Sequence, residues 1–354
     1  MGFSKQLSRF NLKKNISSIS GLLIKLRTFI ALIVLFIFFS LTADNFLEIK
    51  NLIIMTKHVA VTAFCAIGMT FVIISGGIDL SVGSIVGLTG IIAGGLIFEG
   101  LVVPLPMFGI EVTFYFNILI VILIGLLVGC LVGFVNGIVV TRFRVAPFIA
   151  TLGTYHIARG LANIRSGGGT FPRLYGDPAL GTDGFLILGT GDILGIPIAI
   201  WIMLVVFAIA VYITKKTPLG RHIYAVGGNE EAAKLSGIRV KRVRMFVYMF
   251  AGFCSSIAGL IWASQLGAAT PKVGIGFELD AIAAAVLGGT SLSGGIGTIG
   301  GTLIGAFVIT VLGDGMVMIG VSPFLQQVIK GTVIVLAVII DMFQRNMKQK
   351  SALQ

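Results

Sequence analysis

Charged side chains are scarce in this 354-residue chain, at 11% of the sequence, whereas an average soluble domain carries roughly 25%. Hydrophobic residues make up 56%, and the mean hydropathy is +1.04. A soluble fold of this size needs polar groups over its whole exterior, and this chain cannot supply them. The composition therefore excludes ordinary soluble enzymes and nucleic-acid-binding domains, despite a net charge of +12. It also excludes disorder, which requires low hydrophobicity.

Residues that carry chemistry are also few. The three cysteines, Cys65, Cys130 and Cys254, lie in apolar runs, so we expect small buried hydrophobes rather than disulfides or metal ligands. The three histidines are far apart in the sequence. There is no Gly-x-x-x-x-Gly-Lys-Ser/Thr phosphate loop, no His-Glu-x-x-His pair and no Gly-x-Ser-x-Gly elbow. The sequence thus predicts no catalytic residue, metal site or cofactor, and we do not expect this chain to hydrolyse ATP by itself.

Long apolar runs dominate what is present. Runs able to cross the ~30 Å hydrocarbon core of a bilayer predict an all-α, polytopic transmembrane helical bundle of about ten spans. The approximate spans are 28–43, 59–75, 81–98, 115–139, 145–164, 195–214, 245–264, 279–290, 297–319 and 323–342. Several are short or interrupted by glycine, notably 279–290, and a broken or tilted helix is the alternative to a clean span there.

The distribution of lysine and arginine predicts the orientation. Residues 1–27 hold six basic and no acidic residues, and no Ala-x-Ala-like cleavage site precedes Asp44, so we expect an uncleaved first span. With the N-terminus in the cytoplasm and alternating spans, the inner segments carry 19 of the 26 basic residues. These segments are 1–27, 76–80, 141–144, 215–244, 291–296 and 343–354.

This asymmetry follows the positive-inside rule and predicts that both termini are cytoplasmic. The predicted organisation is a basic segment 1–27, a membrane domain 28–342 and a cytoplasmic tail 343–354. The membrane domain contains a large cytoplasmic loop, 215–244. The expected location is the inner (plasma) membrane, where the basic flanks contact anionic lipid rather than nucleic acid.

Glycine is abundant, with 48 residues, and recurs in register. A four-residue spacing leaves a shallow groove along one helix face, so that two backbones can approach closely in lipid. The spaced residues are Gly125, Gly129, Gly133 and Gly137 in one span and Gly297, Gly301 and Gly305 in another. Such grooves serve packing, and the alternative is a sliding surface in a conformational change. Gly76–Gly83 also echoes Gly288–Gly295, a weak hint of an internal repeat on which we base no fold conclusion.

The cytoplasmic loop contains a predicted helix of about two turns. Asn229 suits the N-cap, Glu230 and Glu231 occupy the first turn where the helix dipole favours anions, and Gly237 suits the C′ position. Ala232 and Ala233 favour a helix with small side chains on its surface. Such a helix suits a shallow groove on another protein. The alternative is an ordinary capped helix lying on the membrane surface.

Ionisable residues near or inside spans are functional candidates, because an unpaired charge in the bilayer is costly. They are Asp79, His156, Arg159, Asp280, Asp314 and Lys330. The alternatives are hydrated span ends, interhelical hydrogen bonds and side chains that reach the interface. Asp314 stands out because the apolar run continues on both sides of it. Adding polar groups that could contact a passing solute, the candidates for a translocation path are Asp79, Asn136, Thr151, Asp314 and Gln326.

Four stretches together resemble a known family. They are Gly68–Gly83, Pro147–Thr154, Gly227–Ile238 and Glu278–Leu292. In this order they are similar to the ribose-type monosaccharide permeases of ABC importers, in the superfamily shared with branched-chain amino acid permeases. The resemblance covers roughly residues 50–345.

The resemblance implies a permease subunit of an ATP-driven, binding-protein-dependent importer of a ribose-like monosaccharide. It implies three protein partners: a second copy of the chain in a homodimer, a cytoplasmic ABC ATPase, and a periplasmic or extracellular sugar-binding protein. The cytoplasmic loop would couple the permease to the ATPase. The coupling residues carried over are Gly228, Asn229, Glu230, Glu231, Ala232, Ala233, Ser236 and Gly237.

Two other classes of function remain open at this point. The first is a secondary transporter in which Asp79 or Asp314 binds a proton or Na⁺. The second, with less support, is a membrane-embedded enzyme. The sequence does not identify the sugar and leaves branched-chain amino acids open as substrates.

Overall fold

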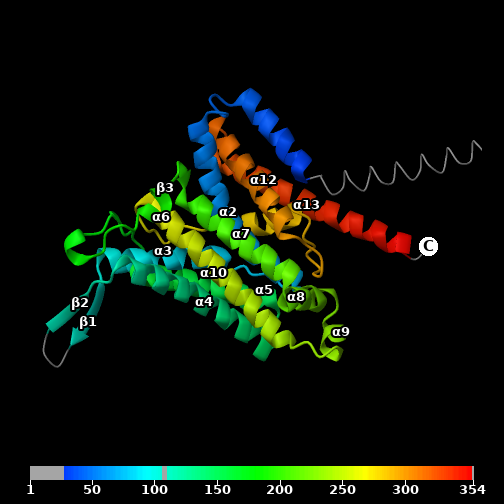
Figure 1. Cartoon of the computed structure of the whole chain (residues 1–354), viewed down its shortest axis with the longest axis horizontal. Coiled ribbons are helices and arrows are strands. Elements are labelled where there is room, and N and C mark those ends of the chain that lie inside the picture. Colours follow the sequence, from blue (N-terminus) through cyan, green and yellow to red (C-terminus); the bar gives the residue numbers. More distant parts are fainter. Residues whose placement is uncertain (1–27, 106–109, 353–354) are drawn as a thin grey trace, which may run out of the picture.

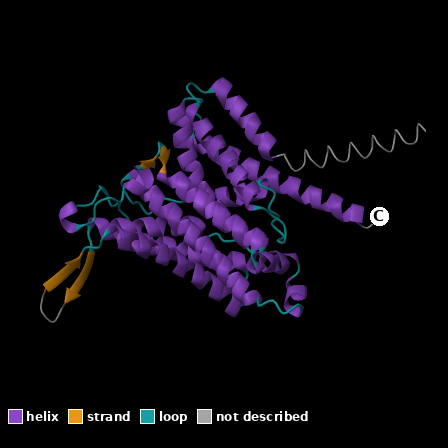
Figure 2. Cartoon of the chain, in the orientation of Figure 1, coloured by secondary structure: helices purple, strands orange, loops and turns teal. Residues whose placement is uncertain are grey.

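The computed structural model describes residues 28–105 and 110–352. Helices form most of this part of the chain (Figure 2). The strands among the described residues form two antiparallel hairpins in connecting loops, and the first hairpin projects from one end of the bundle (Figure 1). The strands are β1 (Leu101–Leu105), β2 (Ile110–Phe114), β3 (Asp192–Ile193) and β4 (Ile196–Pro197). The prediction of an all-α class is therefore confirmed for the bundle itself.

Each predicted apolar run contains one helix. The first is Thr28–Thr42. The others are α2 (Ile49–Ile74), α3 (Val82–Phe98), α4 (Ile118–Arg142), α5 (Pro147–Ser166), α7 (Ile198–Lys216), α10 (Val240–Leu266), α11 (Phe277–Leu287), α12 (Ile299–Met318) and α13 (Pro323–Ala352). Short elements η1 (Pro178–Leu180), α6 (Ile187–Thr190), α8 (Pro218–Gly228) and α9 (Glu230–Leu235) lie in the connections. The doubtful run 279–290 is the short helix α11, which ends just before Gly288.

Five described helices, α2, α4, α7, α10 and α12, are long and apolar enough to cross a membrane. Thr28–Thr42, α3 and the part Pro323–Ile339 of α13 are shorter apolar helices. Only helices and closed barrels satisfy their backbone hydrogen bonds inside a bilayer, so these helices make the chain a multi-pass membrane protein. The total of about ten spans stays a prediction.

Helices α2 and α10 form the centre of the bundle. Both are largely buried, whereas α4 and α7 expose most of their apolar surface. A helix that is hydrophobic all round belongs either in the core, as α2 and α10 do, or against lipid, as we expect for α4 and α7. Cys65 and Cys254 are buried as expected, but Cys130 is only half-buried because it lies on α4 at the periphery.

The glycine stripes serve helix packing. A Cβ added at Gly129 or Gly133 would overlap backbone atoms of α10, and one at Gly305 would overlap Ala284 of α11. Without a side chain at these positions, α4 packs tightly on α10 and α12 on α11. The packing interpretation is therefore confirmed, and sliding at these surfaces stays a prediction.

An antiparallel seam joins α2 to α12, which lie side by side in Figure 1. His58 pairs with Asp314, Thr62 with Thr310 and Thr70 with Thr302, at 2.9, 3.1 and 2.7 Å between the side-chain polar atoms. Each step of four or eight residues up α2 matches an equal step down α12, so the polar pairs share one face of each helix. The seam fixes the register between segments more than 200 residues apart in sequence.

Candidate functional site

The predicted helix in the cytoplasmic loop is present as α9. The Asn229 side-chain oxygen accepts a hydrogen bond from the Ala232 N–H at 2.9 Å, which is the expected N-cap. At the other end Gly237, with φ +82°, occupies the C′ position. Its N–H donates to the Lys234 carbonyl, and the Ile238 N–H donates to the Ala233 carbonyl. This pair of bonds is a Schellman motif, so α9 is closed at both ends.

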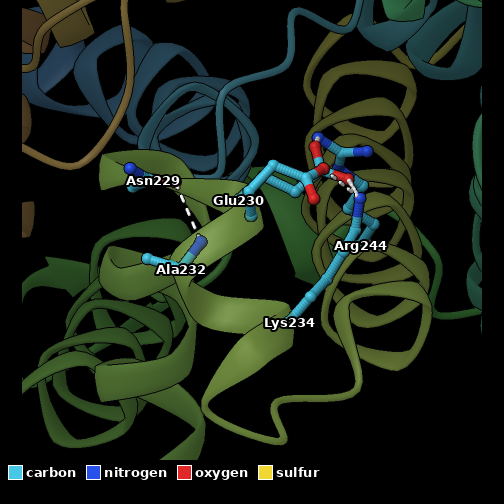
Figure 3. Close-up of polar contacts among 6 residues, drawn as sticks. Asn229, Glu230, Ala232, Lys234 and Arg244 are labelled. Atoms are coloured by element: carbon cyan, nitrogen blue, oxygen red, sulfur yellow. Dashed lines mark hydrogen bonds and ion pairs between the residues drawn. The ribbon is translucent and has the colours of Figure 1, made fainter.

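Ion pairs fix α9 to the start of α10. Glu230 bonds Lys234 within α9 at 2.9 Å and Arg244 of α10 at 2.5 Å, and Lys234 also bonds Glu231 at 2.7 Å (Figure 3). The hydrogen bond from Lys234, together with the charge of Arg244, lowers the pKa of the Glu230 carboxyl. Hydrogen bonds to Glu231 and then Glu230 raise the pKa of Lys234. The ion pair between Glu230 and Arg244 therefore ties α9 to α10.

The two alanines of α9 differ in exposure, which corrects the expectation that both lie on its surface. Ala232 is exposed, but Ala233 is only 4% exposed because it belongs to the main hydrophobic core. A six-residue helix has one face against the protein and one outside, and Ala233 is on the inner face. The outer face instead carries Ala232 and Leu235, whose exposure of 90% the sequence argument did not anticipate. The remaining coupling candidates Gly228, Ser236 and Gly237 are also exposed.

Just before α9, the backbone at the end of α8 packs closely against two other segments of the chain. The Gly295 N–H donates to the Ile74 carbonyl at 2.8 Å, and the Tyr224 hydroxyl donates to the Gly297 carbonyl at 2.8 Å. A Cβ added at Gly227 would overlap the Ile74 carbonyl oxygen and come within 2.7 Å of the Gly295 nitrogen. The end of α8 therefore rests against both the end of α2 and the loop before α12. We refer to Ile74, Gly227 and Gly295 as the glycine junction.

The two glycine motifs that echo each other in sequence thus meet in space. A Cβ added at Gly294 would be 3.1 Å from the Gly76 Cα and 3.1 Å from the Gly227 Cα. Gly294 and Gly76 have φ of +83° and +85°, a region that other residues rarely adopt. Their meeting confirms that both motifs lie at the same end of the bundle. It does not establish an internal repeat.

Three of the five candidates for the translocation path come together. The Asp79 Oδ1 accepts hydrogen bonds from the Ser81 N–H at 2.9 Å, the Ser81 hydroxyl at 2.6 Å and the Asn136 amide at 3.4 Å. Thr151 accepts a bond from the Leu80 N–H at 3.1 Å. Asp79, Asn136 and Thr151 are fully buried, so in this conformation they order the loop between α2 and α3 rather than face an open path.

Asp314 and Gln326 lie elsewhere. Asp314 is on α12, about 22 Å along the helix from Ile299 at about 1.5 Å per residue, and pairs with His58. The helix continues through Asp314 without a break. Gln326 donates from its side-chain amide to the Val321 carbonyl at 2.8 Å, near the start of α13. The structure therefore divides the candidates among three places.

Two further ionisable groups are paired within the bundle. Arg159 donates from its two terminal nitrogens to backbone carbonyls of Pro271, Val273 and Gly83, whereas its buried Nε has no hydrogen-bond partner among the described residues. Lys330 bonds Asp280 at 2.9 Å. The sequence argument missed Ser81 and His58 as partners of the acidic candidates. The signal for His58 was its position directly before the apolar run 59–75, because a histidine at the edge of a membrane-spanning run needs a polar partner.

Packed apolar helices with buried polar partners, and a capped helix exposed at one end, define a polytopic helical membrane protein. Comparison with known proteins specifies the class further. The family described as branched-chain amino acid transport system, permease component, matches residues 51–338. The chain belongs to this family and is a membrane transport permease.

Individual relatives match over nearly the whole chain. The ribose import permease protein RbsC of Haemophilus influenzae is 44% identical, over 91% of this chain and 94% of its own length. RbsC of Bacillus subtilis is 45% identical over the same shares. The L-arabinose ABC transporter permease protein AraH of Azospirillum brasilense is 35% identical, over 90% of this chain and 87% of its own length. No solved structure gives a significant match to this chain.

Proposed function

We propose that this chain is the permease subunit of an ATP-driven, binding-protein-dependent ABC importer that moves a ribose-like monosaccharide across the inner membrane. Relatives named as ribose and arabinose permeases align with about nine-tenths of the chain, which supports this substrate class. The proposal includes about ten spans with both termini cytoplasmic. It also includes a homodimer in membrane lipid, a separate cytoplasmic ATPase and an external sugar-binding protein.

The observation that carries the coupling proposal is the state of α9. The helix is capped at both ends, tied to α10 through Glu230 and Arg244, and presents Ala232 and Leu235 outward. A capped helix that exposes a small alanine beside Leu235, with the paired Glu231 and Lys234 nearby, suits a shallow groove on a partner, since little side-chain entropy is lost where Ala232 docks. The ATPase would bind this face of α9 and supply the energy that the chain itself cannot generate.

The glycine junction gives the movement of α9 a route into the bundle. Gly227 touches the end of α2 and the loop that leads into α12, so displacement of α8 and α9 must shift both elements. Helices α2 and α12 are joined by the polar seam and would move together. The sugar would then pass between helices without chemical change.

The test uses the permease reconstituted in vesicles with its ATPase and its binding protein. Ala232→Trp should lower both ATPase association and ATP-dependent sugar uptake about tenfold or more, because a large side chain fills the docking face. Ala232→Ser, which keeps a small side chain at the same position, should retain both. Unchanged association and uptake in Ala232→Trp would count against docking at α9. Uptake that survives ATP depletion but collapses with an ionophore would instead favour ion coupling.

A further inference from the structure

At the end of the seam opposite the glycine junction, side chains from α2, α10, α11, α12 and α13 form a closed circuit. We call this set the outer circuit. In order around it, the members are His58, Trp262, Phe277, Asp280, Lys330 and Asp314.

The polar half of the outer circuit contains two pairs. His58 Nδ1 lies 2.9 Å from Asp314 Oδ2, and Lys330 Nζ lies 2.9 Å from Asp280 Oδ2. The pairs are neighbours, since a Cβ added at Gly313, next to Asp314, would be 3.7 Å from Lys330 Nζ. Carboxylate, imidazole and ammonium groups from four helices therefore converge on one place.

The aromatic half closes the circuit. The Trp262 ring centroid lies 6.0 Å from that of His58 and 5.4 Å from that of Phe277, the latter in an edge-to-face arrangement. Phe277 and Asp280 are three residues apart on α11 and so share one face of that helix. Trp262 therefore contacts both His58, of the first pair, and Phe277, which lies on the same helix as Asp280 of the second pair.

These groups are accessible although they lie among apolar helices. The side chains of His58, Asp314, Lys330 and Asp280 are 38, 27, 28 and 21% exposed. A cavity of about 160 Å³ lies against the His58–Asp314 pair, and the rest of its lining is Asn51, Ile54, Met55, Val317 and Met318. Well-packed apolar residues could replace a purely structural ion pair at little cost, so an accessible pair beside a cavity points to a ligand.

We propose that the outer circuit is a weak binding subsite for a neutral polyhydroxy solute, a monosaccharide. The indole and phenyl rings would contact the apolar face of a sugar ring. The carboxylates would accept hydrogen bonds from hydroxyls, and the ammonium and imidazole would donate to them. This inference rests on the proposed import function and locates the substrate within it.

The charge balance favours a sugar over an amino acid. Each carboxylate of the outer circuit already has a basic partner at 2.9 Å, so the members of the circuit hold no unpaired cation for a substrate carboxylate. Lys57, whose charge acts on His58, is the neighbouring cation outside the circuit. A zwitterion would have to break a pair, whereas hydroxyls can bond to paired groups without displacing them. His58 lies near the start of α2 and Asp314 near the end of α12, so the circuit occupies the end of the bundle remote from α9. A solute delivered from the outer face would reach it first.

The experiment measures binding to the full-length permease in lipid nanodiscs, without ATPase or binding protein, by saturation-transfer NMR. The probes are D-ribose and L-leucine. D-ribose should receive saturation, and its affinity should fall about tenfold in Asp314→Asn and in Trp262→Leu, as expected when a hydrogen bond to a charged group or a ring contact is lost. L-leucine should show no transfer. Trp201→Leu, at the other tryptophan of the chain on α7, is the matched control and should bind D-ribose like the wild type.

Thermal unfolding of each variant separates loss of the subsite from loss of the fold. If Asp314→Asn or Trp262→Leu is unfolded, His58→Gln and Trp262→Phe replace them, with weakened and retained D-ribose binding expected respectively. Equal D-ribose affinity in wild type and folded variants, absence of transfer to wild type, or preferential transfer to L-leucine would overturn the subsite. ATP-independent uptake with intact D-ribose binding would contradict the import mechanism alone, because the binding assay contains no ATPase.

Discussion

At the scale of single residues, the chain shows how a local sequence pattern builds a short capped helix, α9. Asn229 accepts the hydrogen bond that starts α9, and Gly237 adopts the left-handed conformation that ends it. Both roles depend on neighbours within a few residues, and for this reason the sequence predicted them. Glu230 adds a tertiary link, because its partner Arg244 lies in the next helix.

Replacing Asn229 by alanine should loosen α9 without changing the bundle. Loss of an N-cap hydrogen bond costs about 1 kcal/mol, so hydrogen exchange at the backbone amides of α9 should become about fivefold faster. Asn229→Asp, which keeps the accepting oxygen, is the control and should exchange like the wild type. Equal exchange in Asn229→Ala and wild type would mean that the ion pairs alone hold the helix.

At the scale of elements, the end of α8, just before α9, contacts the bundle through its backbone. Gly227, Ile74 and Gly295 meet where three segments distant in sequence converge. The Ile74 carbonyl can approach this closely only because residue 227 has no side chain. The polar seam between α2 and α12 then links the glycine junction to the outer circuit.

Gly227→Ala should therefore uncouple ATP hydrolysis from transport. The added methyl group would overlap the Ile74 carbonyl and force α8 from the end of α2, a distortion that typically costs about 1–3 kcal/mol. We expect uptake by the complete transporter to fall more than its ATPase activity, measured in parallel in the same vesicles. Gly300→Ala is the matched control, since nothing lies within 4 Å of a Cβ there. A parallel loss in both variants would show that the junction has no special role.

At the scale of the whole molecule, the distribution of charge predicts one topology for the helices. The basic residues concentrate in the segments that the alternating model places inside, and α8 and α9 fold in the largest of these. The loop after α5 contains η1, α6 and a short hairpin and is predicted to lie outside. Helix α7 separates these two regions.

Two equally exposed leucines test this topology. Leu194, in the predicted external loop, and Leu235, on α9, are both 90% exposed. In a chain whose native cysteines are replaced, Leu194→Cys should react with a membrane-impermeant maleimide in intact cells. Leu235→Cys should react only after the membrane is opened, when the permease is expressed without its ATPase. The reverse pattern would place both termini outside, and labelling of both in intact cells would show that α7 does not cross.

The sequence alone predicted the helices but not the tertiary contacts between them. The apolar runs and the glycine spacing are periodic within one segment, so the positions of the helices and the packing face of α4 could be predicted. The sequence could not predict that Asp79, Asn136 and Thr151 lie together while Asp314 lies elsewhere. All five path candidates are similar polar residues in apolar surroundings. Ala233 shows the same limit, since burial on one side of a short helix depends on what lies beside it.

By itself, the sequence determined that this protein is a multi-pass helical bundle with a short capped helix in its large loop, because hydrophobicity, caps and glycine periods act over one or a few helical turns. Only the tertiary structure decided that Gly227 meets Ile74 and Gly295, and that His58 and Trp262 complete a circuit with Asp314. The physical reason is that these contacts join segments far apart along the chain, and their register is fixed by the packing of whole helices rather than by any local preference.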